Sequence, residues 1–224
     1  MDLLQRNPGG RNFAESILGS QSSQEARGDS MTRQLFLIFA LAAASLQAEP
    51  TNWKIDTSHS AAQFSVKHMM VSTVRGHFGT LAGTAVYDAA NPAATKVEAT
   101  VDVNTIDTRN ERRDKHLRSA DFFDVENHPQ MTFKSKSFSV VSPGKMKMTG
   151  DLTIRGTTKE VTFELEGPTA PINTGRGLKM GAVATTVINR KDFGMTWNRA
   201  IEAGGVTVGD EVTLTIDIQL DQVK

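Results

Sequence analysis

The sequence contains no cysteine in its 224 residues. This absence excludes a disulfide framework, a thiolate metal site and a cysteine nucleophile. The chain also lacks net charge, because Lys+Arg and Asp+Glu both number 25. No overall field therefore draws it to nucleic acid or to an anionic membrane, and we expect no nucleic-acid partner. Walker loops, dinucleotide fingerprints and HExxH motifs are missing too, so we expect neither a cofactor nor a metal.

Long hydrophobic runs are scarce, and the run that stands out is LFLIFALAAA at 35–44. It is too short for a transmembrane anchor, the alternative interpretation, because crossing hydrocarbon takes about 20 apolar residues. A short cationic start, Met31-Thr32-Arg33, precedes the run, and SLQA (45–48) follows it. This three-part layout predicts a secretory signal peptide over 31–48, cleaved after Ala48, and hence a periplasmic protein without stable membrane insertion.

Residues 1–30 are polar and show no sustained periodicity. They are expected to be a disordered leader, or to lie upstream of a true start at Met31. Residues 49–224 then form one folded domain, since a single all-β domain often takes up this length.

The mature part of the chain is dominated by alternation of apolar and polar residues. KVEATVDVNT (96–105), EVTFELE (160–166) and EVTLTIDIQLD (211–221) each place their apolar residues on one face. Such alternation predicts strands that are buried on one face and solvated on the other. Further strands are expected near 53–59, 76–88, 130–141, 145–155 and 180–190. The segments SPGK (142–145) and RGTT (155–158) look like the tight turns between consecutive strands.

One convincing helix is predicted over 108–118, where Thr108 and Glu111 fit a capping box. Its only large apolar residue is Leu117, so this helix cannot cover a sheet. The apolar strand faces must then bury one another, which requires a closed barrel or two packed sheets. Short turns between consecutive strands favour an all-β, single extended antiparallel barrel of about eight strands, with one or two short helices near the rim. A sandwich is the alternative. Periodicity does not decide whether side chains or a ligand fill such a barrel.

Several segments resemble the YceI-like family of lipocalin-like periplasmic proteins. They are WKIDTSHSAAQFSVKHMMVSTVRGHF (53–78), DTRNERRDKHLRSADFFDVENHPQMTFKS (107–135), GDLTIRGTTKEVTFELE (150–166), INRKDFGMTWN (188–198) and VGDEVTLTIDIQL (208–220). Together they span essentially the whole of 49–224, in the expected order. The resemblance implies a lipocalin-like barrel that binds, carries or stores a long isoprenoid, such as an isoprenoid quinone or a prenyl phosphate, in its cavity.

By this resemblance the lipid tail would lie among inward-facing apolar side chains. The candidates in the strands are Phe64, Val66, Phe78, Val101, Phe133, Leu152, Ile154, Phe163, Leu214 and Ile216. Phe122 and Phe123 are candidates for the cavity entrance, and Phe193 and Trp197 for a similar role. The competing interpretation is that all these residues simply form the barrel core.

The helical segment 109–118 carries five basic and two acidic residues, a local excess of positive charge in a neutral protein. Arginine forks suit phosphate oxygens, so a prenyl pyrophosphate head group is a candidate ligand here. The candidate head-group residues are Arg109, Arg112, Arg113 and His116. The alternatives are a solvated helix face with internal ion pairs, and a role of Arg113 and Asp114 in bracing the helix against the barrel rim.

Other functions remain open. His59, His68 and His77 are nine residues apart, which does not match the spacing of metal ligands. Asp56, His59 and Ser60 suggest a hydrolase triad, but no GxSxG elbow accompanies them, so we expect no catalysis. The remaining alternatives are a stress-related partner-binding module, a carrier of a fatty-acid-like amphiphile, and an enzyme acting on a lipophilic substrate in the same cavity. A homodimer is also plausible.

Overall fold

A computed structural model describes residues 49–201 and 204–223, and these form mostly β-strands. The strands in chain order are β1 (Thr51–Ile55), β2 (Ala61–His68), β3 (Ser72–Phe78), β4 (Leu81–Tyr87), β5 (Lys96–Asp102), β6 (Ile106–Asp107), β7 (Gln130–Ser142), β8 (Lys145–Ile154), β9 (Thr157–Glu166), β10 (Ile172–Asn173), β11 (Leu178–Asn189) and β12 (Val208–Gln222). The helical elements are α2 (Glu111–Arg118) and the 3-10 turns η1 (Pro92–Ala94), η2 (Val103–Thr105) and η3 (Arg190–Phe193). The predicted leader (1–30) and signal peptide (31–48) lie outside the described residues.

Eight strands close into an antiparallel barrel. Neighbouring strands pair in the order β11-β9-β8-β7-β5-β4-β1-β12, and β12 pairs back onto β11. This closure leaves no free edge within the ring of eight strands, and the ring encloses one interior. The predicted all-β barrel of about eight strands is therefore confirmed, and the sandwich alternative is wrong.

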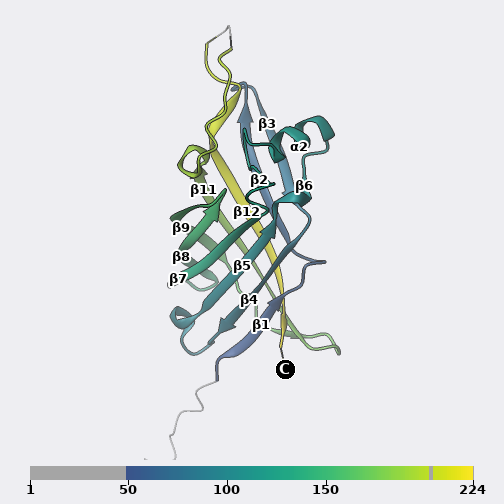
Figure 1. The fold of residues 1–224 in the computed structure, drawn as a ribbon. Helices are drawn as coiled ribbons and strands as arrows, with labels where there is room; N and C mark the ends of the chain where they lie inside the picture. Colours follow the sequence, from purple (N-terminus) through teal and green to yellow (C-terminus); the bar gives the residue numbers. More distant parts are fainter. Residues whose placement is uncertain (1–48, 202–203, 224) are drawn as a thin grey trace, which may run out of the picture. The chain divides into compact units, whose positions relative to one another are not determined.

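Two further strands lengthen the barrel. β12 pairs with β1 near Leu220 and with β2 from Asp217 to Val208, so β1 and β2 follow one another along the same edge of β12. β3 then pairs with β2, as β4 pairs with β1. The strands therefore run on past the closed ring, and the barrel is extended along its axis (Figure 1).

The inward face of each strand follows the alternation in the sequence. On β12, Val212, Leu214, Ile216 and Ile218 face the interior, while the residues between them are mostly polar. Hydrophobic burial, worth roughly 25 cal/mol per Å², drives this arrangement. The turns at 142–145 and 155–158 connect β7 to β8 and β8 to β9 as predicted, with Arg155 and Gly156 both at positive φ.

The helix α2 lies beside the barrel and begins later than the capping box predicts (Figure 1). Asn110 is the N-cap, and its side chain accepts a hydrogen bond from the Arg113 N–H at 3.0 Å. Thr108 instead donates its N–H to the buried Asp114 carboxylate at 3.0 Å, so the predicted Thr108–Glu111 capping box is wrong. Asparagine is as good an N-cap as threonine, and the buried carboxylate competes for Thr108. Within the part that the structure describes, no helix is long and apolar enough to cross a membrane.

Candidate functional site

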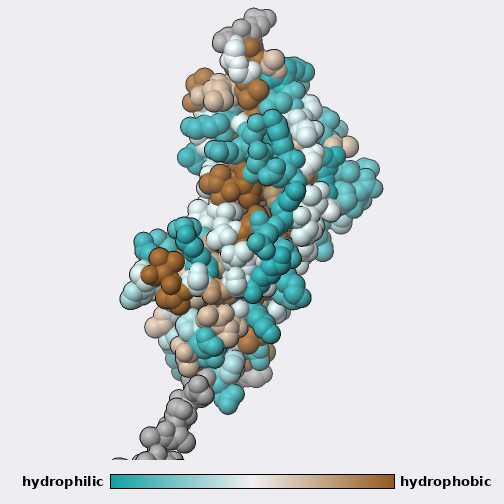
Figure 2. Space-filling model, turned by 90° about the vertical axis from the view of Figure 1, so that its left-hand side faces the viewer, coloured by the Kyte–Doolittle hydropathy of each residue, from teal (hydrophilic) through white to brown (hydrophobic). Residues whose placement is uncertain are grey.

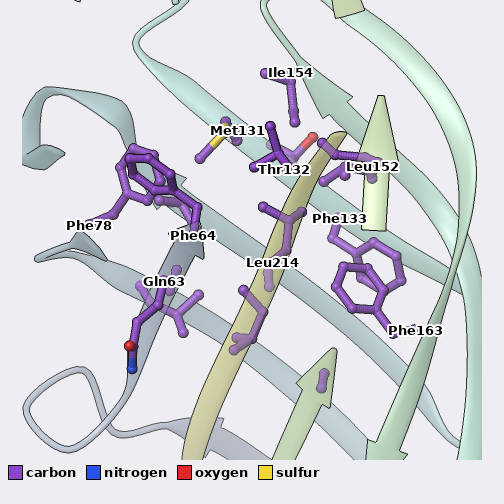
Figure 3. A pocket seen from close by; sticks show the side chains of 18 of the residues that line it. Gln63, Phe64, Phe78, Met131, Thr132, Phe133, Leu152, Ile154, Phe163 and Leu214 are labelled. Carbon is purple, nitrogen blue, oxygen red and sulfur yellow. The ribbon is translucent and has the colours of Figure 1, made fainter. Parts of the chain in front are cut away.

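The barrel contains an apolar cavity with a volume of about 160 Å³. One water molecule occupies only about 10–15 Å³ on the same measure, so the space is much larger than a packing defect. Two pairs of aromatic rings face one another across it: Phe64 and Phe78 lie 5.7 Å apart, and Phe133 and Phe163 lie 5.3 Å apart. Leu214 lies between the two pairs (Figure 3). We call this space the main cavity.

The wall of the main cavity offers almost no polar group to a ligand. The polar residues that line it are Gln63, Thr132 and Arg190. Gln63 and Thr132 are exposed on the outside of their strands, and Figure 3 shows the Gln63 amide directed away from the apolar side chains. Only Arg190 is buried. The site can therefore hold an apolar chain, but it cannot hydrogen-bond a polar ligand along its length.

The structure brings most of the predicted cavity residues together in this wall. The predicted residues that line it are Phe64, Val66, Phe78, Val101, Phe122, Phe123, Phe133, Leu152, Ile154, Phe163, Leu214 and Ile216. Phe193 and Trp197 do not line it. Phe193 is 1% exposed and packs in a core cluster with Leu152 and Ile188, whereas Trp197 packs against Phe122 with ring centroids 5.3 Å apart.

A second, smaller cavity of about 60 Å³ lies in the same barrel. Its lining is also apolar, and the residues there that carry a hydroxyl group are Thr84, Thr95 and Tyr87. Five residues line both cavities: Ile55, Val97, Met148, Ala184 and Ile218. The two spaces are therefore neighbours that share one wall.

The predicted head-group residues lie outside the main cavity. Arg109 and Arg112 are exposed on the surface of the segment that carries α2. Arg113 donates from Nε to Thr108 Oγ1 and from its terminal nitrogen to the Thr108 carbonyl, each at 2.7 Å. These bonds tie the start of α2 to Thr108, in the segment before the helix. His116 Nε2 lies 2.8 Å from Asp121 Oδ2, and its ring packs edge-on against the rings of both Phe122 and Trp197, which also contact each other. One aromatic ring, Phe122, thus separates His116 from the main cavity.

Arg190 is the polar residue of the site that the sequence analysis missed. It is 2% exposed and donates to the carbonyls of Gly209 at 2.8 Å and Trp197 at 2.9 Å. It also donates to the Met195 and Val208 carbonyls and lies 3.4 Å from Asp210. Burial lowers the pKa of its guanidinium from the usual value, and the Asp210 carboxylate opposes that change.

These bonds join residues 195–197 to residues 208–210 at the barrel, where Met195 and Val208 line the main cavity. The signal for Arg190 was present in the sequence. Met180, Ala184 and Ile188 are buried at even positions of β11, and position 190 continues that alternation. The N–H groups of an arginine at such a buried position need hydrogen-bond acceptors within the protein, because solvent does not reach them. Met131 and Leu117 also line the cavity and were not predicted to do so.

The three residues that suggested a hydrolase do not form a triad. His59 Nδ1 lies 2.8 Å from Asp56 Oδ2, but the Ser60 hydroxyl accepts a hydrogen bond from the Gln219 N–H at 2.9 Å. Asp56 Oδ2 also accepts from Gln219 Nε2 at 2.8 Å and lies 3.5 Å from Lys179 Nζ. The cluster therefore joins the loop after β1 to β11 and β12. Among the described residues, no group of three or more histidines and acidic residues is placed to hold a metal ion.

This cluster predicts a pH effect on stability. The hydrogen bond from His59 is the main cause that lowers the pKa of Asp56 from 3.8 to about 2. Because the pKa is lower in the folded state, the contribution of Asp56 is complete above pH 3.8 and is lost as the pH falls towards 2. Urea unfolding at a series of pH values should therefore show that wild type loses more stability in this window than Asp56→Asn.

Two results check this assignment independently. His59→Ala should raise the Asp56 pKa towards its usual value, measured by NMR titration of the carboxyl carbon, because it removes the strongest partner. An identical acid dependence in wild type and Asp56→Asn would contradict the assignment.

Comparison with known proteins places the barrel in a family. The family model of the YceI-like domain matches residues 53–220. A UPF0312 protein of Staphylococcus aureus (strain MSSA476) is 39% identical over 163 residues, covering 72% of this chain and 92% of that protein. The crystal structure of a Campylobacter jejuni YCEI protein matches with 30% identity and a TM-score of 0.60, covering 70% of this chain and 90% of that one.

A third similar structure is a polyisoprenoid binding domain from Saccharophagus degradans. It matches with 12% identity and a TM-score of 0.55, covering 76% of this chain and 98% of that chain. This likeness concerns the fold. The family model covers every strand of the barrel from β2 to β11 and most of β1 and β12, and the resemblance seen in the sequence is confirmed: the chain belongs to the family of proteins with a YceI-like domain.

Proposed function

We propose that this protein is a non-catalytic binding protein for a long-chain isoprenoid lipid, whose tail occupies the main cavity. The observation that carries the proposal is the composition of the wall, in which the single buried polar residue, Arg190, already donates its hydrogen bonds to the protein. A hydrocarbon tail needs no hydrogen-bonding partner. Its transfer from water is favourable by roughly 0.8 kcal/mol per buried CH₂ group.

The shape of the wall supports an isoprenoid over a straight acyl chain. Aromatic rings and branched side chains project into the cavity, among them Phe64, Phe78 and Leu214 (Figure 3), and such a wall has an uneven surface. The methyl branches of an isoprenoid can fill such spaces, which an unbranched chain would leave empty. The Saccharophagus degradans domain, which shares the fold, is described as binding polyisoprenoids. We assign the same ligand class to this chain, and a fatty-acid-like amphiphile is the alternative that the experiment below distinguishes.

For the head group we propose the surface beside α2. Phe122 lines the main cavity and packs on His116 with ring centroids 5.1 Å apart, so a chain that leaves the cavity at Phe122 reaches the surface of this segment. Arg109 and Arg112 are exposed there. Guanidinium groups in this position suit a phosphate-bearing head group.

We propose that the protein acts in the periplasm, as a carrier or store for lipid that water would otherwise exclude. The basis is the signal-peptide layout at 31–48 in the sequence. A closed barrel that covers the tail would let such a lipid cross an aqueous space.

A partner-binding module is the competing function, and it requires a contiguous exposed apolar patch. On the face shown in Figure 2, hydrophobic residues form small separate areas within a mostly hydrophilic surface. The exposed apolar side chains include those of the turn Met69–Val71 and the hairpin end Val140–Val141, which belong to different hairpins. Neither observation favours a partner-binding surface over the cavity.

The experiment is native mass spectrometry of residues 49–224, purified from the periplasm of the source organism, followed by organic extraction and fragmentation. The proposal predicts a bound species whose fragments differ by five-carbon isoprene units. A straight acyl chain would retain the binding function and overturn the ligand class. A protein that carries no lipid and takes up none from vesicles would overturn the proposed function and favour the partner-binding module.

A further inference from the structure

The two cavities lie end to end along the barrel. On β8, Met146 lines only the second cavity, Met148 lines both, and Leu152 lines only the main cavity. On β12, Leu220 lines only the second cavity, Ile218 lines both, and Ile216 lines only the main cavity. Since inward residues on one strand rise in steps along the barrel, the shared residues form a layer between the two spaces.

This layer is built by five strands. Ile55 comes from β1, Val97 from β5, Met148 from β8, Ala184 from β11 and Ile218 from β12. Ile55, Met148 and Ala184 are 4%, 6% and 2% exposed, so this level of the barrel is closed to solvent at these three strands. We call these residues the dividing layer.

Only one member of the dividing layer can change its shape easily. Isoleucine and valine are β-branched and stiff at χ1, and alanine has no side-chain torsion to change. Methionine has three rotatable bonds and adapts to irregular spaces. Met148 is therefore the side chain that could move aside to connect the main cavity with the second one.

We infer that the dividing layer, with Met148 as its movable member, sets the length of the isoprenoid tail that the protein prefers. This inference rests on the proposed function. A tail that fits the main cavity ends against Met148. A longer tail has to displace Met148 into or past the second cavity, which removes packing contacts that the protein makes without ligand.

The test uses competition among polyprenyl alcohols of graded length, supplied in equal amounts to delipidated protein and read by native mass spectrometry. Met148→Ala opens the layer, so the preferred tail should lengthen by at least one isoprene unit. Affinity for that longer homologue should rise by about tenfold or more, because the added carbons become buried in the second cavity. Ile55→Ala opens the same layer from β1 and should shift the preference in the same direction if Met148→Ala folds poorly.

Met146→Ala is the matched control. Met146 is on the same strand, is 7% exposed and loses the same atoms, but it lines only the second cavity. Its removal leaves the dividing layer in place, so the preferred length should stay that of wild type. Ala182→Leu, which fills the second cavity, should likewise leave the wild-type preference unchanged and should reverse the shift in a Met148→Ala background.

The outcomes separate this inference from the proposed function. If wild type and all variants bind isoprenoids and prefer the same tail length, this result would overturn the role of the dividing layer but retain the binding function. If Ala182→Leu bound a shorter tail than wild type, this would also overturn the role of the dividing layer, because the tail in wild type would already occupy the second cavity. Protein that binds no polyprenyl alcohol would overturn both.

Discussion

Replacing Ala99 with tryptophan should lower the affinity for a long isoprenoid by at least about tenfold, which corresponds to about 1.4 kcal/mol. Ala99 lies on β5, opposite Phe133 of β7, and its side chain lines the main cavity. An indole at this position would occupy the space proposed for the tail. This loss corresponds to displacing only about two CH₂ groups, at roughly 0.8 kcal/mol each.

The same substitution should leave the fold intact, because the ring enters a space of about 160 Å³ that protein atoms do not fill. The control is Lys96→Trp, which introduces the same indole at an exposed position of the same strand and should bind lipid as wild type does. Affinity can be measured by titrating delipidated protein with a radiolabelled polyprenyl alcohol. Equal affinities for wild type and folded Ala99→Trp would place the tail somewhere other than the main cavity.

Arg190→Gln should cost about 3–5 kcal/mol of the free energy of unfolding, the range for breaking a buried, fully bonded charge network. The arginine is 2% exposed and bonds the carbonyls of Trp197 and Gly209. Glutamine cannot reach all of these acceptors, so buried carbonyls would be left without donors. The substitution should also separate residues 195–197 from residues 208–210, which hydrogen exchange would detect as faster exchange at both places.

Lys191→Gln is the matched control for Arg190→Gln. Lys191 pairs with the same Asp210 at 2.8 Å, but its side chain is 45% exposed. Exposed ion pairs contribute only about 0–1 kcal/mol, so this variant should stay close to wild type in urea unfolding. Similar losses for the two variants would mean that Arg190 acts through its ion pair with Asp210 rather than through the main-chain carbonyls.

The strands and their inward faces could be predicted from the sequence, because apolar and polar residues alternate with the period of a strand. Leu214 and Ile216 on β12 and Phe163 on β9 line the main cavity for this reason. Alternation fails where a strand ends. Phe193 lies in the η3 turn and Trp197 in the segment after it, where the backbone no longer has period two, and neither lines the cavity.

Features that depend on strand register and side-chain packing could not be predicted from the sequence. The dividing layer arises because Met148, Ala184 and Ile218 all line both cavities, and which residues of different strands meet there depends on strand pairing. The charged segment at α2 could be recognised, but not the internal bond between Arg113 and Thr108 that occupies one of its arginines. Arg190 directly follows β11, as the first residue of η3, and continues the alternation of that strand by one position; the pattern does not predict it because a buried arginine is rare.

The most direct test of the central claim is an NMR measurement of where the tail lies. Methionine methyl groups labelled with ¹³C report on separate places: Met131 and Met148 line the main cavity, Met180 lines the second cavity, and Met70 is exposed in the β2–β3 turn. With an unlabelled polyprenyl alcohol bound, we predict intermolecular NOEs from the tail to the Met131 and Met148 methyl groups. NOEs confined to Met70, or none to the cavity methyl groups in a saturated complex, would contradict the account.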